Sequence, residues 1–278
     1  MAEALAAEIV PTRGMLKELS RKGARVLTSR RRPHEMLLFV HKRSRLERVP
    51  YGVVGIIAPW NFPFSVPVPE IAAALLAGNG VLFNPAPHAI LVGRRIEGFF
   101  NAVGFPPDLI QTLHLLDREA HYLTAHPGLD KLIFTGSTTV GCRVMANAAG
   151  NIVPVLLELG GKDPAIVAAD ADVVRAARGI IWGAFFNAGQ VCASMYVARS
   201  VAEPFLAACL AEIQQLCIGD PLDPQTDIGP LSWVEPSAPW RGHKQSAIGA
   251  THADLGLLEM SRVKYISYDR GQRADNLW

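Results

Sequence analysis

Cys192 lies in a local sequence that favours a reactive thiol. It follows Gln190 and precedes Ala193-Ser194, between a long helical pattern and a strand-like run. Reactive side chains usually lie on such loops at the end of an element. As a thiolate, Cys192 could attack an aldehyde carbonyl and form a tetrahedral thiohemiacetal. The alternative is a buried, inert cysteine, an interpretation that we keep for the three cysteines on helical patterns, Cys142, Cys209 and Cys217.

Asn61 is a candidate donor to the oxyanion that such an attack creates. It lies just past a strand-like run, between Trp60 and Phe62, in the sequence Pro-Trp-Asn-Phe-Pro. Pro59 and Pro63 restrict the backbone on both sides, which suits a donor held in place. Its amide and the backbone N–H of Cys192 could together stabilise the developing charge. The alternative is an ordinary turn asparagine, which is common beside proline.

Glu158 is a candidate general base. It follows the apolar run Val153–Leu157 and precedes Gly160-Gly161. A carboxylate at the end of a buried strand is costly unless it is paired or holds a proton. Such a group can activate the water that hydrolyses a thioester. The alternative is a structural partner for Lys162 or for a backbone amide.

A turn that opens a helix is a candidate phosphate site. Gly136-Ser137-Thr138 follows the strand-like run Lys131–Thr135, and Gly141 permits close packing in the first helical turn. Backbone and hydroxyl donors at a helix N-terminus suit a pyrophosphate. The pattern is not the G-x-G-x-x-G fingerprint, so ordinary N-capping is the alternative.

These residues need strands and helices to position them, and the chain from Tyr51 onward has that texture. Apolar runs alternate with helical patterns, which indicates βαβ units with right-handed crossovers and a parallel sheet covered on both faces. The expected strands are Val53–Ala58, Gly80–Asn84, Ile110–Leu115, Lys131–Thr135, Val153–Leu157 and Ala165–Ala168. The expected helices are Val68–Leu76, His88–Val103, Arg118–Ala125, Val140–Ala148 and Ala171–Asn187, with Gly78 and Gly104 as helix stops.

The flanking regions are simpler. Residues 1–20 have a weak helical pattern, and residues 21–48 are basic, as a solvated face or an edge strand would be. After Cys192 we expect a strand over Met195–Val201 and a helix over Pro204–Leu216. A loop follows at 219–224, and residues 229–245 read as irregular. Over Leu255–Ser267 we expect a helical turn followed by a strand.

Composition excludes several classes of partner. The 278 residues are 50% hydrophobic, enough for a sizeable core, and carry a net charge of +2. That charge selects neither nucleic acid nor membrane, and the basic region has no interleaved aromatic residues for stacking on bases. No apolar run is long enough to span a bilayer, and charged residues interrupt the N-terminus, so we expect no secretory signal. Four cysteines without metal-ligand spacing predict reduced thiols in a cytoplasmic protein.

The motifs, in this order, resemble the aldehyde dehydrogenase superfamily from about Tyr51 to Leu231. The resemblance implies Cys192 as nucleophile, Asn61 in the oxyanion hole and Glu158 as general base. It implies thiohemiacetal formation, hydride transfer to the nicotinamide of NAD or NADP, and hydrolysis of the thioester to a carboxylate. The residues that it places around the cofactor are Ile57, Pro59, Trp60, Asn84, Phe134, Gly136, Ser137, Leu159 and Gly160.

The family resemblance also implies the architecture. The fold class is α/β, with a doubly wound parallel-sheet cofactor domain and a truncated catalytic domain, and the family's small oligomerisation hairpin implies a homo-oligomer. We expect an N-terminal helical and basic segment at 1–50, a dinucleotide-binding domain at 51–190, a catalytic-domain remnant at 191–236 and a C-terminal segment at 237–278. The tail, with Pro239–Ser246 and Leu257–Met260, resembles the family's C-terminal segment.

The chain departs from the family pattern in several places. Between Leu231 and the tail, the stretch that carries the family's Glu-x-Phe-Gly-Pro motif is missing, which indicates an internal deletion, and the N-terminus is short. Asn84–Pro87 replaces a turn whose Lys holds the adenine ribose, and Leu116–Ala120 has no glycine. Three functions therefore stay open: an NAD(P)-dependent dehydrogenase acting on a small aldehyde, a catalytically inactive homologue, and a cofactor-independent thiol esterase.

Overall fold

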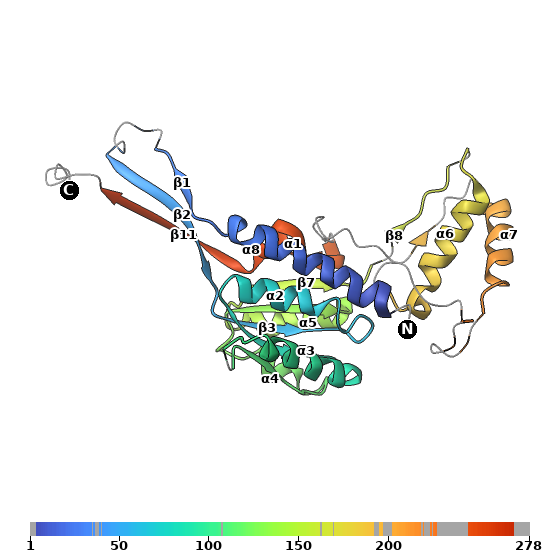
Figure 1. Cartoon of the computed structure of the whole chain (residues 1–278), viewed down its shortest axis with the longest axis horizontal. Helices are drawn as coiled ribbons and strands as arrows, with labels where there is room; N and C mark the ends of the chain where they lie inside the picture. The colour runs from blue at the N-terminus through green and yellow to red at the C-terminus, as the bar shows by residue number, and fades with distance from the viewer. Residues whose placement is uncertain are drawn as a thin grey trace.

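The structure is a computed structural model that describes most of the chain (Figure 1). The described residues are 4–34, 36, 39, 41–106, 108–161, 163–168, 170–191, 195–196, 202–217, 219, 223, 225–226 and 244–269. Cys192, the proposed nucleophile, lies outside them, as does most of the expected irregular region at 229–245. Within the described ranges, none of the helices combines the length and apolar character needed to cross a bilayer.

A six-stranded sheet forms the centre of the α/β body, with the strand order β10-β7-β6-β3-β4-β5. Its strands are β3 (Val53–Ile57), β4 (Gly80–Asn84), β5 (Ile110–Thr112), β6 (Lys131–Gly136), β7 (Val155–Leu159) and β10 (Ala247–Ile248). Five of them are parallel, and β10 adds one antiparallel edge strand to β7. The chain runs outward from β3 to β5 and then returns to the other side of β3 with β6.

Helices cover both faces of this sheet, which makes it doubly wound. On one face lie α1 (Val10–Val26), α2 (Pro67–Leu76), α3 (Ile90–Ala102) and α8 (Ala253–Glu259), whose buried residues form one core with Val54, Ile56 and Leu156. On the other face, α4 (Ala120–Thr124) and α5 (Thr138–Ala149) pack on Ile57, Phe134 and Leu157. Neighbouring strand residues point to opposite faces, so continuous apolar strands fill both layers.

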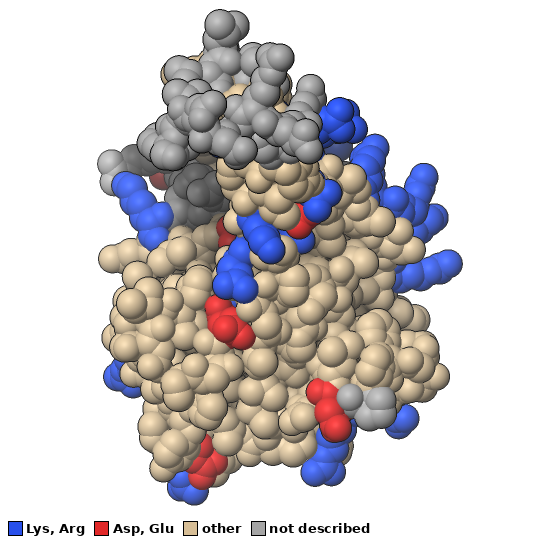
Figure 2. Space-filling model, turned by 90° about the vertical axis from the view of Figure 1, so that its left-hand side faces the viewer, with Lys and Arg blue, Asp and Glu red and all other residues tan. Residues whose placement is uncertain are grey.

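The C-terminal segment packs onto the α/β body and returns along the N-terminal part of the chain. After η6 (Lys244–Ser246) and β10, helix α8 packs against α1 and α2. Strand β11 (Ser261–Asp269) then pairs antiparallel with the whole of β2 (Lys42–Pro50), and β1 (Arg30–Arg32) pairs with the other edge of β2. This three-stranded ribbon projects from the body (Figure 1). Lys and Arg side chains gather around it in the upper part of Figure 2.

A second unit follows the sheet. Helix α6 (Val173–Phe185) and helix α7 (Ala202–Ile213) pack on each other around a small core that contains Val167, Ala177 and Phe205. The two-residue strands β8 (Asp163–Pro164) and β9 (Met195–Tyr196) pair beside them. The remaining short helices are η1 (Ala4–Ile9), η3 (Pro87–Ala89) and η4 (Phe186–Gly189).

Several expectations from the sequence were wrong in detail. Residues 165–168 form no strand; Val167 is buried in the α6–α7 core, and its neighbour Ile166 is exposed. The N-terminal helix continues to Val26, into the basic region. Strand β5 ends at Thr112 because Asn84 binds the following backbone at Leu115.

Two of the cysteine expectations also fail. Cys142 is on α5 but is exposed, because it faces away from the sheet. Cys217 is exposed as well and comes after the end of α7. Cys209 is buried on α7, as expected. The strand expected over Met195–Val201 is described only as β9, and residues 197–201 lie outside the described ranges.

A buried lysine predicts a measurable dependence on its carboxylate partner. Lys131 is 2% exposed, and its Nζ lies 3.3 Å from Glu259 Oε2 and 5.0 Å from the centre of the Tyr51 ring. Burial lowers the pKa of Lys131, and Glu259 partly restores it. Removing the carboxylate leaves a buried ammonium group without its counter-charge. We expect Glu259→Ala to lower the free energy of unfolding by about 2 kcal/mol, measured by urea denaturation.

A double variant serves as the control for that prediction. Lys131→Met keeps the length of the side chain and removes the charge that Glu259 balances. In the Lys131→Met background, Glu259→Ala should therefore cost much less than it does alone. Equal costs in the two backgrounds would show that the ion pair contributes nothing to stability.

Candidate active site

The residues implied around a cofactor lie at one edge of the central sheet. The registers place Ile57 beside Asn84 and Phe134, and they place Gly136 beside Leu159 on the next strand. All these residues stand at the carboxyl ends of neighbouring parallel strands. The strand order reverses between β3 and β6, and open α/β sheets bind ligands at such a switch point, outside the carboxyl ends.

The start of α5 lies at this switch point. Ser137 caps the helix, because its Oγ accepts a hydrogen bond from Val140 N at 3.3 Å, so the expected N-capping is present. An added Cβ on Gly141 would lie 2.5 Å from Leu159 Cδ2, so the helix can approach β7 closely only with glycine there. A Cβ on Gly136 would lie 2.4 Å from the Phe134 ring. The first-turn N–H groups of α5 therefore face the strand ends at short range.

The side chains at the ends of β3 and β4 have contrasting surroundings. Asn84 is buried, and its Oδ1 accepts a hydrogen bond from Leu115 N at 3.0 Å. Its backbone carbonyl accepts one from Ala58 N at 3.1 Å. Trp60, two residues further along, is 50% exposed. The amide of Asn84 thus ties the end of β4 to the loop after β5, a role that the sequence did not indicate.

Asn61 contacts the loop that leads to Cys192. Its Nδ2 donates a hydrogen bond to the carbonyl of Gln190 at 2.7 Å, and its backbone carbonyl accepts one from Asn187 Nδ2 at 3.0 Å. Asn187 Nδ2 also lies 3.3 Å from the Gln190 carbonyl. Two segments 129 residues apart are therefore joined by their amides, and one of them ends two residues before Cys192.

Aromatic rings support the same junction. The rings of Phe62 and Phe186 stack with their centres 5.9 Å apart, and Trp182 on α6 contacts Phe186 at 5.5 Å. Asn187 and Ala188 both adopt positive φ angles, which turn the chain sharply out of α6 toward Gln190. The sequence predicted a loop after a long helix here, and the structure adds that the loop folds back onto the end of β3.

Glu158 is largely buried on β7, with 8% of its surface exposed, beside Thr135 on β6 and Ala247 on β10. Leu156, two residues earlier, belongs to the core under α2, so Glu158 points toward that same face. A second carboxyl group, Glu70 on α2, is 4% exposed there. Burial raises the pKa of Glu70 to about 8, and the charge of Glu158 raises it further.

The sequence analysis missed Glu70, although a signal was present. It is the single charged residue in α2, whose sequence is otherwise apolar, Pro-Val-Pro-Glu-Ile-Ala-Ala-Ala-Leu-Leu. A lone carboxyl group on a helix that is apolar all round is a candidate for a buried titratable group. In the part of the chain that the structure describes, no group of three or more His, Cys, Asp or Glu side chains is placed to hold a metal ion.

Comparison with known proteins gives this edge of the sheet a family. The family model for the aldehyde dehydrogenase family matches residues 1–233. The chain belongs to the aldehyde dehydrogenase family. It is 38% identical over 251 residues to the 4,4'-diapolycopene aldehyde oxidase of a Methylomonas species, covering 88% of this chain and 46% of that protein. It is 38% identical over 187 residues to betaine aldehyde dehydrogenase 2 of Rhizobium meliloti (strain 1021), covering 66% and 39%.

Solved structures agree on the fold. The Mycobacterium tuberculosis aldehyde dehydrogenase complexed with NAD+ superposes with a TM-score of 0.88 at 21% identity, covering 98% of this chain and 79% of that one. The aldehyde dehydrogenase of Brucella melitensis gives a TM-score of 0.87 at 22% identity, covering 95% and 77%. The chain nevertheless spans less than half the length of the curated relatives described above.

Proposed function

We propose that this chain oxidises an aldehyde to a carboxylate with NAD(P)⁺, with Cys192 as the nucleophile. The observation that carries the proposal is the contact between the Asn61 amide and the Gln190 carbonyl at 2.7 Å. It brings an oxyanion donor to the segment that ends at the thiol, beside the switch point of the sheet. Family membership supports the same chemistry, and the relatives described above include a betaine aldehyde dehydrogenase.

The residues at the strand ends fit a dinucleotide. We propose that the start of α5, with Gly136 and Ser137, binds the pyrophosphate, because first-turn N–H groups of a helix suit an anion. Ile57, Pro59, Trp60 and Phe134 would line the same edge, with Asn84, Leu159 and Gly160 around them. No charged side chain is present at Asn84, so both NAD and NADP remain candidates. When bound, this cofactor accepts a hydride from the carbon that carries the substrate's hydrogen.

The protein's own residues would perform the other steps. The Cys192 thiolate forms a bond to the aldehyde carbon, and the electron pair of the carbonyl moves to oxygen, where the Asn61 amide stabilises it. After oxidation, Glu158 takes a proton from water as that water attacks the thioester carbon. The carbon–sulfur bond then breaks, its electron pair returns to the Cys192 sulfur, and the carboxylate is released.

The wider organisation is proposed on the same basis. We propose the division into segments at 1–50, 51–190, 191–236 and 237–278, a homo-oligomer, and a cytoplasmic location. The ribbon supports oligomerisation, because β11 exposes apolar and aromatic side chains, including Val263 and Tyr265, which are 54% and 56% exposed. Such a patch on a projecting sheet is typical of a protein interface.

Turnover assays on the purified chain test the proposed function. We expect aldehyde-dependent formation of NADH or NADPH that disappears in Cys192→Ala. Cys142→Ala is the matched control, because it removes an exposed thiol on α5 and should leave turnover unchanged. Short, long and aromatic aldehydes should each be supplied with either nucleotide.

A second assay separates the alternatives. Hydrolysis of an activated ester without nucleotide, lost in Cys192→Ala, needs only the thiol, the oxyanion donors and a base. That result without aldehyde oxidation would indicate a thiol esterase, which the engaged amide of Asn84 favours. Neither activity, in a chain that melts cooperatively, would identify an inactive homologue.

A further inference from the structure

A buried carboxyl group on α2 has no role in the chemistry derived so far. Glu70 is 4% exposed, and its Oε2 atom has no hydrogen-bond partner among the described residues. It lies between Val68 and Ile71, which belong to the main core. A buried polar atom of this kind costs free energy unless the structure uses it.

Glu70 faces the same layer of the fold as Glu158. Along β7, Leu157 packs on the α5 face, and Leu156 packs on the face of α2 and α8. Side chains alternate along a strand, so Glu158 follows Leu156 onto the α2 face. On that face the segment from Ala247, which pairs with Glu158, runs through Thr251 and His252 into α8. Thr251 and His252 line a pocket together with Glu70.

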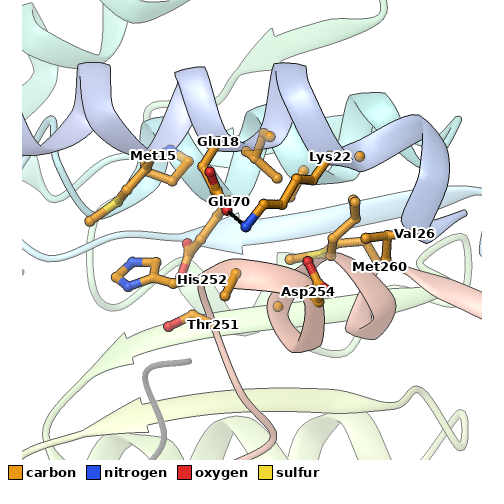
Figure 3. Close-up of a pocket in the computed structure, with 16 residues that line it drawn as sticks. Met15, Glu18, Lys22, Val26, Glu70, Thr251, His252, Asp254 and Met260 are labelled. Atoms are coloured by element: carbon orange, nitrogen blue, oxygen red, sulfur yellow. Dashed lines mark ion pairs between the residues drawn. The ribbon is translucent and has the colours of Figure 1, made fainter. Parts of the chain in front are cut away.

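The other titratable groups around that pocket do not neutralise Glu70. Figure 3 shows Glu70 between α1 above it and His252 and Thr251 below it. Glu18 and Lys22 on α1 form an ion pair with each other. Burial lowers the pKa of His252 to about 4, so this ring is neutral at neutral pH. Asp254 on α8 is exposed. Glu158 is the described group whose charge raises the pKa of Glu70.

We propose that Glu70 and Glu158 form a carboxyl pair that shares one proton at neutral pH, with Glu70 as a positioning residue that keeps Glu158 ionised. Two adjacent carboxylates resist double ionisation, and the more buried group keeps the proton. Burial holds that proton on Glu70, because its pKa of about 8 lies above neutrality. Glu158, near the strand ends, then remains the proton acceptor. The role in catalysis rests on the proposed function, whereas the pair itself does not.

Infrared titration of the carboxyl groups tests the pair without any activity assay. In the wild-type chain, a protonated carboxylic acid band should persist at neutral pH and disappear as the pH rises through about 8. Glu70→Gln should remove this transition. Glu158→Gln should lower its midpoint by about one pH unit, because the neighbouring charge is gone. Asp254→Asn, an exposed carboxyl at the same pocket, is the control and should leave the transition in place.

Thermal melts supply a second readout with a definite sign. The pKa of Glu70 is higher in the folded chain than its ordinary value of 4.5. The associated stability is therefore complete below that value and is lost as the pH rises through about 8. Glu70→Gln should melt above the wild type at alkaline pH, and the difference should shrink as the pH falls toward 4.5.

The outcomes divide cleanly. A high-pH transition that survives in Glu70→Gln, or a midpoint unchanged in Glu158→Gln, would overturn the pair. With a working enzyme, the wild-type kcat should rise as the second proton leaves the pair, and Glu70→Gln should lose this step while KM stays constant. If no variant turns over aldehyde and the coupled titration is intact, the proposed function fails and the carboxyl pair stands.

Discussion

Asn61→Ala should lower kcat for aldehyde oxidation by roughly 100- to 1000-fold, the usual effect of removing one oxyanion donor. The amide hydrogen of Asn61 is presented at the carbonyl of Gln190, 2.7 Å away, next to the segment that ends at Cys192. In the transition state this donor would stabilise the charge on the former carbonyl oxygen. Because the donor acts on charge that develops during the reaction, KM should change far less than kcat.

Asn187→Gly is the matched control for that experiment. Asn187 donates to the carbonyls of Asn61 and Gln190, so it also ties the two loops together. Its φ angle is +50°, a conformation that glycine adopts without strain. This variant removes a tether and leaves the proposed oxyanion donor intact, so its kcat should fall by less than about tenfold. Equal losses in the two variants would mean that Asn61 only positions the loop.

Asn79→Leu should lower the free energy of unfolding by about 4 kcal/mol, because it leaves four buried backbone groups without partners. Asn79 is completely buried. Its Oδ1 accepts hydrogen bonds from Tyr51 N and Gly52 N at 2.7 and 3.1 Å. Its Nδ2 donates to the carbonyls of Ala74 and Met260, both at 2.9 Å. One amide thus joins the entry to β3, the end of α2 and the end of α8, and uses its full hydrogen-bonding capacity.

Thermal and urea denaturation would measure this loss, with Asn151→Ala as the control. Asn151 also donates an amide hydrogen bond, to the carbonyl of Ala125 at 2.8 Å, but it is exposed, so water can replace the contact. The control should cost less than about 1 kcal/mol. For Asn79→Leu we expect a fall in Tm of roughly 10 °C. A fall no larger than that of the control would show that water reaches this junction.

Much of the α/β core could be predicted from the sequence because its parallel strands are buried on both faces. Continuous apolar runs such as Gly80–Asn84 have few alternatives, and the predicted and observed bounds of β4 coincide. The expected run Ala165–Ala168 failed because it is short and apolar without a neighbouring strand to pair with. Length and composition alone do not separate a buried loop from a strand.

The candidate site divides in the same way. Chemical identity was readable: a thiol, an amide, a carboxylate and a glycine-serine turn each stand after an apolar run, and the family comparison agrees with that order. Partners across the fold were not. The amide oxygen of Asn84 binds Leu115 N, and Glu70 lies near Glu158, although nothing in the spacing of these residues indicates either contact.

By itself, the sequence determined the family of this chain, the α/β class of its sheet and the residue types at the strand ends. Local chemistry and apolar periodicity are written directly in the order of residues. The tertiary structure alone decided that β10 closes the sheet beside Glu158, that β11 pairs with β2 more than 200 residues away, and that α2 carries a buried acid into the same layer. Such contacts depend on backbone pairing and on packing between distant segments, which are cooperative properties of the whole fold.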